Sequence, residues 1–161
     1  MTETEISGYA SLFWTRDLND DVTAAGAFAE SLARTGSGGV RMLCQHDGDH
    51  PVGVWDEIVE DARGLFVRGR IIEVTPQGRL CAALVRAGAM DGLSIGFRAS
   101  KARPDGTGRL RVLTKVELWE VSVVTFPMLP GARIDQVIPL PAGEGGAHAQ
   151  HGRVRDYALA G

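Results

Sequence analysis

The strongest structural signal in the chain is the run Val116-Glu117-Leu118-Trp119-Glu120-Val121-Ser122-Val123-Val124. Its two alternating faces are both largely apolar, which is typical of a strand that is covered on both sides. The run is the second half of a longer expected strand, Arg109 to Thr125, and this length predicts a bulge or bend near Lys115. The sequence therefore indicates one long and mostly buried β-strand.

Shorter segments before and after this run also alternate between apolar and polar residues, and turn residues separate them. The further strands that we expect are Ile6 to Trp14, Val40 to His46, Val52 to Glu60, Leu65 to Ile72, Leu93 to Ser100 and Ile134 to Ile138. The four residues from Asp61 to Gly64 have turn composition, so the two strands that they join should form a hairpin.

Two short helices complete the expected secondary structure. The first is predicted over Thr23 to Arg34, and the second begins after a Thr75 cap, with Pro76 at its first position. The second helix is expected to bury the stripe Leu80, Ala83, Leu84 and Ala87. Seven or so strands with two helices predict a single α+β domain, with a strand-rich, barrel-like antiparallel sheet flanked by short helices.

Length and composition exclude several classes of protein. The 161 residues are 44% hydrophobic and 23% charged, as in an ordinary globular domain, and no run approaches the roughly 20 apolar residues of a membrane helix. A net charge of -3 argues against nonspecific binding to nucleic acid. We expect a cytoplasmic protein with a domain over residues 1–138 and a flexible tail over 139–161, where glycine is frequent and apolar patterning is weak.

Ser94 is the candidate nucleophile. In its strand, Leu93, Ile95 and Phe97 share one face, while Ser94 and Arg98 share the other. A serine displayed beside the small Gly96 leaves room for a substrate backbone, and either a backbone N–H near the nucleophile, such as that of Ile95, or Arg98 is a candidate oxyanion donor. The alternative is that this serine is only part of the polar face of a strand.

His46 and Glu120 are the candidate base and orienting acid. His46 is predicted to end its strand at the edge of a loop, where a rigid backbone aims a side chain into a cleft. Glu120 lies on a strand with two apolar faces, and a histidine ring N–H would satisfy a carboxylate buried there. Glu117, on the opposite face, is the competing candidate for the orienting role. The structural alternative is that His46 and Glu120 are ordinary side chains exposed to water.

A metal site and a thiol site are weaker interpretations. His46 and His50 have suitable ligand chemistry, but Gly48 and Pro51 make the intervening segment a loop, in which this spacing does not bring the two rings together. Cys44 shares a face with His46 at a spacing beyond hydrogen-bond reach, and Cys44 and Cys81 have the surroundings of reduced core thiols. We expect no metal and no cofactor.

Several blocks of the sequence, in this order and spacing, resemble the prohead (capsid maturation) serine proteases of tailed phages. The blocks are Gly8-Tyr9-Ala10, Gly26-Ala27-Phe28, Gln45-His46-Asp47 with Pro51 to Trp55, Leu93 to Phe97, and Trp119 to Thr125 with Pro127. The resemblance covers roughly residues 6–138 and departs from the family pattern at Met128-Leu129. Proteases of this type also occur in prophages and in gene transfer agents.

The resemblance implies a fold related to the herpesvirus capsid protease and an endopeptidase that removes scaffold segments inside an immature capsid. Carried over by position, Ser94 would be the nucleophile, His46 the general base and Glu120 the orienting acid. The implied partners are the major capsid protein and its scaffold segment, without specific nucleic acid or membrane, and a homodimer stays open. The competing hypotheses are a noncatalytic capsid-assembly or scaffold-binding β domain and a metal-dependent hydrolase on His46 and His50.

Overall fold

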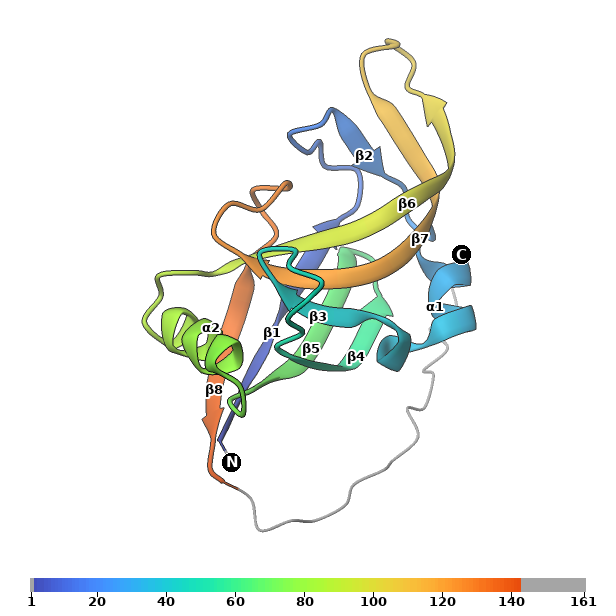
Figure 1. Ribbon diagram of the computed structural model, residues 1–161. Coiled ribbons are helices and arrows are strands. Elements are labelled where there is room, and N and C mark those ends of the chain that lie inside the picture. The colour runs from blue at the N-terminus through green and yellow to red at the C-terminus, as the bar shows by residue number, and fades with distance from the viewer. Residues whose placement is uncertain (1, 143–161) are drawn as a thin grey trace.

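The computed structural model describes residues 2–142, and within this range one eight-stranded sheet is accompanied by two α-helices and a short 3₁₀ turn (Figure 1). The strands are β1 (Glu3–Leu12), β2 (Asp21–Thr23), β3 (Arg41–Cys44), β4 (Gly53–Glu60), β5 (Gly64–Ile72), β6 (Gly92–Pro104), β7 (Arg111–Val124) and β8 (Ile134–Leu140). The helices are α1 (Ala29–Thr35) and α2 (Pro76–Arg86), and the 3₁₀ turn is Ser37–Gly39.

The long strand predicted from the apolar run is β7, and three other strands pair with it. Antiparallel β6 follows β7 along most of its length, β2 pairs in parallel with its first residues, and β3 pairs in parallel near its end, from Arg41 opposite Glu120 to Cys44 opposite Val123. The sheet continues from β3 through β4, β5 and β1 to β8 and does not close. The α+β class is confirmed, but the sheet is mixed and open instead of antiparallel throughout.

The core lies between the curved halves of this sheet and is built mainly from strand residues. The largest fully buried side chains are Ile6, Phe28, Met42, Leu65, Val67, Ile71, Leu93, Leu113, Val116, Leu118, Val121 and Val123. Five of these twelve belong to β7, because both faces of that strand are covered along much of its length. Arg111, Thr114 and Trp119 are the exposed residues of this strand, and Trp119 lies at a point where the β6–β7 register shifts.

The expected hairpin and the expected bend are confirmed. β4 and β5 pair around the turn that starts at Asp61, whose carboxylate accepts the backbone N–H groups of Arg63 and Gly64. In the long β6–β7 pair, Lys101 faces Lys115 between two register shifts, which is the irregularity that the length of the strand predicted. Figure 1 shows the far end of this pair extending beyond the body of the sheet.

The predicted start of the first helix and the predicted end of the first strand were wrong. Thr23 belongs to β2, where it pairs with Leu113, and Gly26 has a φ of 85°, so α1 begins only at Ala29. The chain also leaves the strand conformation at Trp14, which has a φ of 58°, and β1 accordingly ends at Leu12. In each case a residue with positive φ interrupts an element that the apolar pattern alone would continue.

Helix α2 begins where the sequence predicted, but it buries a different face. Thr75 Oγ1 accepts the backbone N–H of Gly78 at 3.1 Å, which confirms the cap. The buried residues are Gly78, Cys81, Ala82 and Val85, whereas Leu80 and Leu84 are exposed. The small residues face β5 because the backbone of the helix comes so close that a Cβ on Gly78 would lie 3.2 Å from the carbonyl carbon of Ile72.

At the C-terminal side, β8 extends two residues beyond the predicted end at Ile138 and pairs with β1 up to Leu140. The rest of the predicted tail, from residue 143 onward, lies outside the described residues, as do His148 and His151. Within residues 2–142, neither helix is long and apolar enough to cross a membrane.

The cap of α2 gives a direct test of this fold. Replacing Thr75→Ala removes the acceptor of the Gly78 N–H and should lower the free energy of unfolding by about 1 kcal/mol, which corresponds to about 3 °C in melting temperature. Thr75→Ser keeps an equivalent oxygen and is the matched control. Differential scanning calorimetry of the two variants measures the difference, and equal melting temperatures would show that the cap contributes nothing.

Candidate active site

The position of His46 depends on an unusual turn after β3. Gln45 and His46 have φ values of 55° and 59°, in the left-handed region, which costs on the order of 1–3 kcal/mol for each non-glycine residue. Hydrogen bonds to β7 and to the residue after it hold the turn. The Gln45 N–H binds the Val123 carbonyl at 2.9 Å, and the Gln45 amide group makes two bonds with Thr125. The prediction that His46 ends a strand was therefore wrong, since β3 stops at Cys44 and the turn redirects the ring.

This turn places the His46 ring against Glu120. Nδ1 of His46 forms a close hydrogen bond with Oε1 of Glu120, whose side chain is only 12% exposed. The second carboxylate oxygen, Oε2, accepts the Ser122 hydroxyl at 2.7 Å. In the parallel β3–β7 pair, Cys44 at the end of β3 lies opposite Val123, next to Ser122 in β7, so the turn begins close to these side chains.

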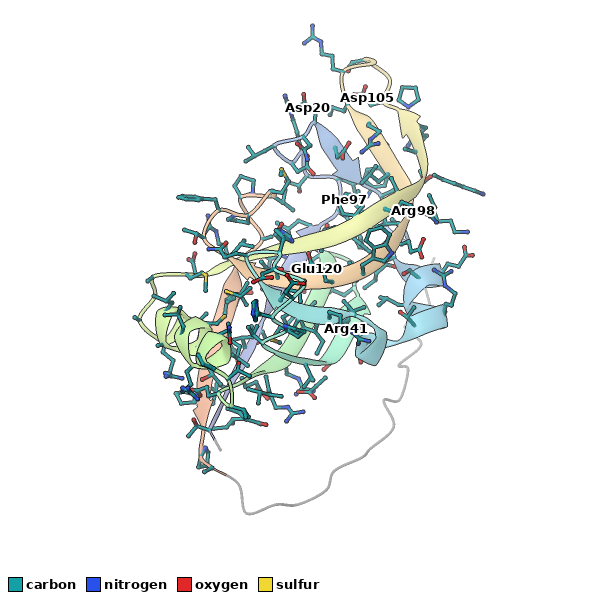
Figure 2. All side chains as sticks on the ribbon, in the orientation of Figure 1. Asp20, Arg41, Phe97, Arg98, Asp105 and Glu120 are labelled. Atoms are coloured by element: carbon teal, nitrogen blue, oxygen red, sulfur yellow. The ribbon has the colours of Figure 1, made fainter. Side chains whose placement is uncertain are left out.

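Glu117, the competing carboxylate, is committed elsewhere. It binds Arg98 at 2.7 Å and lies 3.8 Å from Arg34, and the hydrogen bond from Arg98 lowers its pKa below the usual range. Figure 2 shows Glu120 and Arg98 well apart along the β6–β7 pair. The structure thus brings together His46 and Glu120, and not His46 and Glu117.

Gly96 makes room for the Glu120 side chain. It lies opposite Glu120 in the β6–β7 pair, and a Cβ built on it would be 2.6 Å from Cγ and 2.7 Å from Cδ of Glu120. Real Cβ atoms do not approach other atoms so closely, so any larger residue at position 96 would displace the carboxylate. The glycine beside the candidate nucleophile therefore admits the orienting carboxylate, whereas the sequence had suggested that it admits substrate.

Ser94 lies on the neighbouring strand, opposite Ser122, and is 5% exposed. Ser94 and His46 line one cavity of about 130 Å³, together with apolar residues such as Phe97, Leu113 and Leu129. Among residues 2–142, no hydrogen bond joins Ser94 to the His46 ring. Such a bond is often long in a free enzyme and tightens only when substrate binds.

The two candidate oxyanion donors differ in their surroundings. The Leu93 N–H points away from β7 and binds the Ala132 carbonyl at 2.9 Å. Because N–H groups alternate between the two edges of a strand, the Ile95 N–H points to the same side, where β6 has no partner strand among residues 2–142. Arg98 is held by Glu117 and does not line the cavity that contains Ser94.

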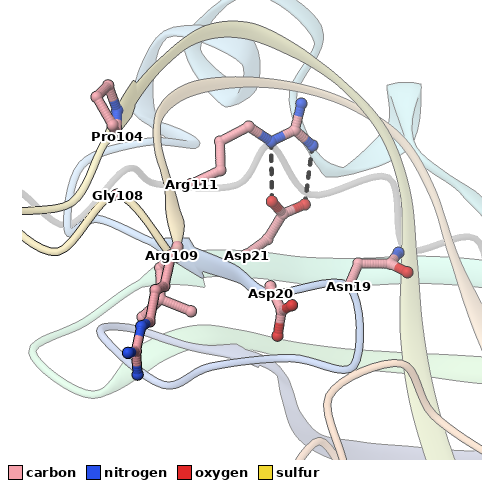
Figure 3. A pocket seen from close by; sticks show the side chains of 8 residues that line it. Asn19, Asp20, Asp21, Pro104, Gly108, Arg109 and Arg111 are labelled. Atoms are coloured by element: carbon pink, nitrogen blue, oxygen red, sulfur yellow. Dashed lines mark hydrogen bonds and ion pairs between the residues drawn. The ribbon is translucent and has the colours of Figure 1, made fainter.

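The far wall of the cavity is polar and acidic. It includes Asp17, Asn19 and Asp21, and burial raises the pKa of Asp17 above its usual value. Asn19 and Asp21 also border a second hollow of about 570 Å³ beside the turn that joins β6 and β7, where Asp21 forms a two-bond ion pair with Arg111 (Figure 3). Asp17 and Asn19 lie in the loop after β1, which carries no strand or helix pattern in the sequence, and Asp21 begins β2.

The remaining candidates lie apart from this arrangement. His50 Nδ1 binds Asp47 at 2.8 Å and does not join His46. Cys81 is buried in α2 and Cys44 is half-buried at the end of β3, and both are free thiols. Ser122 was not a candidate from the sequence, although it shares a face with Glu120, and its hydroxyl binds the Glu120 carboxylate.

Known proteins share sequence or fold with this chain. A family model described as caudovirus prohead serine protease matches residues 1–140. The prohead protease of Enterobacteria phage HK97 is 34% identical over 122 residues, which cover 74% of this chain and 54% of the relative. The prohead protease of Escherichia phage T5 is 30% identical over 124 residues, covering 76% and 58%. The chain thus spans a little over half the length of these two curated relatives.

Two solved structures share the fold at low sequence identity. The capsid assembly protease of bacteriophage T4 has a TM-score of 0.59 and 16% identity, covering 74% of this chain and 80% of its own. The KSHV protease, in a complex with a hexapeptide phosphonate inhibitor, has a TM-score of 0.53 and 12% identity, covering 82% and 64%. The match to the family model over nearly all of the described residues decides the assignment, and the chain belongs to the caudovirus prohead serine protease family.

Proposed function

We propose that this chain is a serine endopeptidase that cleaves capsid or scaffold protein during prohead maturation. The observation that carries the proposal is that a histidine held by a nearly buried carboxylate lines the same cavity as a buried serine. These are the parts of a nucleophile, base and orienter set, which is recognised by geometry and not by chain order. Membership of the prohead protease family supports the same activity.

The roles of the three side chains follow from their contacts. Glu120 accepts the Nδ1–H of His46, which leaves the Nε2 lone pair available to take the hydroxyl proton of Ser94. Ser94 Oγ then forms a bond to the scissile carbonyl carbon, and the imidazolium returns the proton to the leaving amine. Water activated by the same imidazole hydrolyses the acyl-enzyme, which restores Ser94.

The Ile95 N–H is the better supported oxyanion donor. It follows the nucleophile directly and points to the open edge of β6, whereas the guanidinium of Arg98 is occupied by Glu117. A backbone donor of this kind requires no movement at the moment of reaction, which is the property that makes oxyanion holes effective.

The proposed partner is a capsid protein with its scaffold segment, and the proposed place of action is the interior of the immature capsid. The relatives named prohead proteases support this assignment. The acyl-transfer route through Ser94 and His46 needs no cofactor.

The central prediction concerns the nucleophile and the base. Co-expression of wild-type chain with the major capsid protein of the same genome should shorten that protein at one internal bond, and Ser94→Ala or His46→Ala should leave it whole. Intact-mass spectrometry measures the result. In parallel, a fluorophosphonate probe should label wild type and not Ser94→Ala. If none of the three proteins cleaves the capsid protein or reacts with the probe, the chain is a noncatalytic assembly domain. If Ser94→Ala is labelled as fast as wild type, Ser94 is not the nucleophile.

A second prediction tests whether the missing side chain of Gly96 is needed to position Glu120. Gly96→Ala should displace the carboxylate from His46 and slow fluorophosphonate labelling by about 100-fold, the cost of roughly 1 Å of misplacement. Gly106→Ala in the β6–β7 turn is the control, because a Cβ there meets nothing within 4 Å. Equal labelling rates for the two variants would contradict the importance of the Glu120 position.

A third prediction separates the two oxyanion donors. Removing a true donor costs about 10²- to 10³-fold in rate. Arg98→Met should therefore slow capsid-protein cleavage less than about threefold if the Ile95 N–H is the donor. Time courses of cleavage by intact mass give the rate, and a loss of 100-fold or more would transfer the role to Arg98.

A further inference from the structure

Ser122 lies at the centre of the site, but the proposed roles of Ser94, His46 and Glu120 give it no part in the reaction. It is 0% exposed, and it lies in β7 between Leu43 of β3 and Ser94 of β6. Its Oγ accepts the backbone N–H of His46 at 3.1 Å and donates to Oε2 of Glu120 at 2.7 Å. One hydroxyl therefore contacts both members of the His46–Glu120 pair.

The donors and acceptors of these hydrogen bonds determine which nitrogen of the His46 ring carries a proton. The Ser122 oxygen accepts the His46 N–H, and its hydroxyl donates its single proton to Oε2 of Glu120. An ionised carboxylate only accepts hydrogen bonds, so Nδ1 of His46 must carry the proton that it shares with Oε1. Nε2 is then the free acceptor of the ring.

The bonds close a ring that begins and ends at His46. They run from the His46 backbone to Ser122, from Ser122 to Glu120, and from Glu120 back to the imidazole. This closed path couples the left-handed turn to the imidazole. Neither the turn backbone nor the imidazole ring can move without breaking one of these hydrogen bonds. Being fully buried, Ser122 has no surface with which to touch a substrate.

We propose that Ser122 is a positioning residue that fixes the tautomer and the orientation of His46 through Glu120 and through the His46 backbone. The expected effect of Ser122 on the reaction rate rests on the proposed serine protease function. The hydrogen bonds of Ser122 are present in the structure whether or not the chain is active.

The first test compares two buried serines that each accept a backbone N–H. Ser122→Ala should slow fluorophosphonate labelling of Ser94 by about 10- to 100-fold. Ser31→Ala is the matched control, because Ser31 Oγ accepts the Leu118 N–H at 3.0 Å from α1 and lies outside the cavity. Both variants should lose a few degrees of melting temperature, and only Ser122→Ala should lose labelling rate. Equal rates would overturn the proposal.

A double-mutant cycle shows whether Ser122 acts through Glu120. In a Glu120→Gln background the tautomer control is already lost, so adding Ser122→Ala should slow labelling by less than about threefold. If Ser122→Ala costs the same factor in both backgrounds, the hydroxyl acts independently of Glu120 and the positioning role is wrong.

Proton NMR separates failure of this inference from failure of the proposed function. A ring N–H resonance of His46, assigned with ¹⁵N-histidine, should be resolved and slowly exchanging in Ser94→Ala, and it should be lost or broadened in Ser122→Ala. This readout requires no enzymatic activity. If Ser94 is never labelled and the resonance still depends on Ser122, the protease proposal alone fails. If the resonance is unchanged in Ser122→Ala, the positioning role fails even in an active enzyme.

Discussion

The parallel pairing of β3 with β7 is the constraint on which the site depends. It sets Leu43 opposite Ser122 and Cys44 opposite Val123, so the turn after β3 begins where His46 can reach both Ser122 and Glu120. β6, paired with β7 on its other edge, brings Ser94 opposite Ser122. A shift of either register by one residue would move these side chains to the other face of the sheet. Pairing with β7 therefore assembles the site from three separate segments.

Two unfavourable features of the site compensate each other. Two consecutive left-handed residues and a nearly buried carboxylate are each costly alone. The turn supplies the imidazole that partners the carboxylate. The Val123 carbonyl and the Ser122 hydroxyl of β7, together with Thr125 just after it, hold the turn. Within residues 2–142, no buried side-chain nitrogen or oxygen lacks a hydrogen-bond partner. Strain is thus concentrated where a side chain must be held in one orientation.

The elements that the sequence predicted well are those whose signal is local. The β4–β5 hairpin, the Thr75 cap and the bend at Lys115 each follow from turn chemistry, capping or strand length within a few residues. Two of the errors come from contacts between elements. Thr23 is drawn into β2 by its pairing with Leu113, and α2 turns its small residues inward because β5 lies close to its backbone. Apolar period alone predicts the opposite face for Leu80 and Leu84.

The sequence by itself determined the α+β class, the long central strand, and the identity of Ser94, His46 and Glu120 as candidates. It determined these because residue type, alternation and motif order are properties of the chain alone. Only the tertiary structure decided that Glu120 and not Glu117 meets His46, that Gly96 makes space for it, and that Ser122 links the two. Those relations join residues up to 76 positions apart, and strand register, which no local pattern encodes, sets which of them meet.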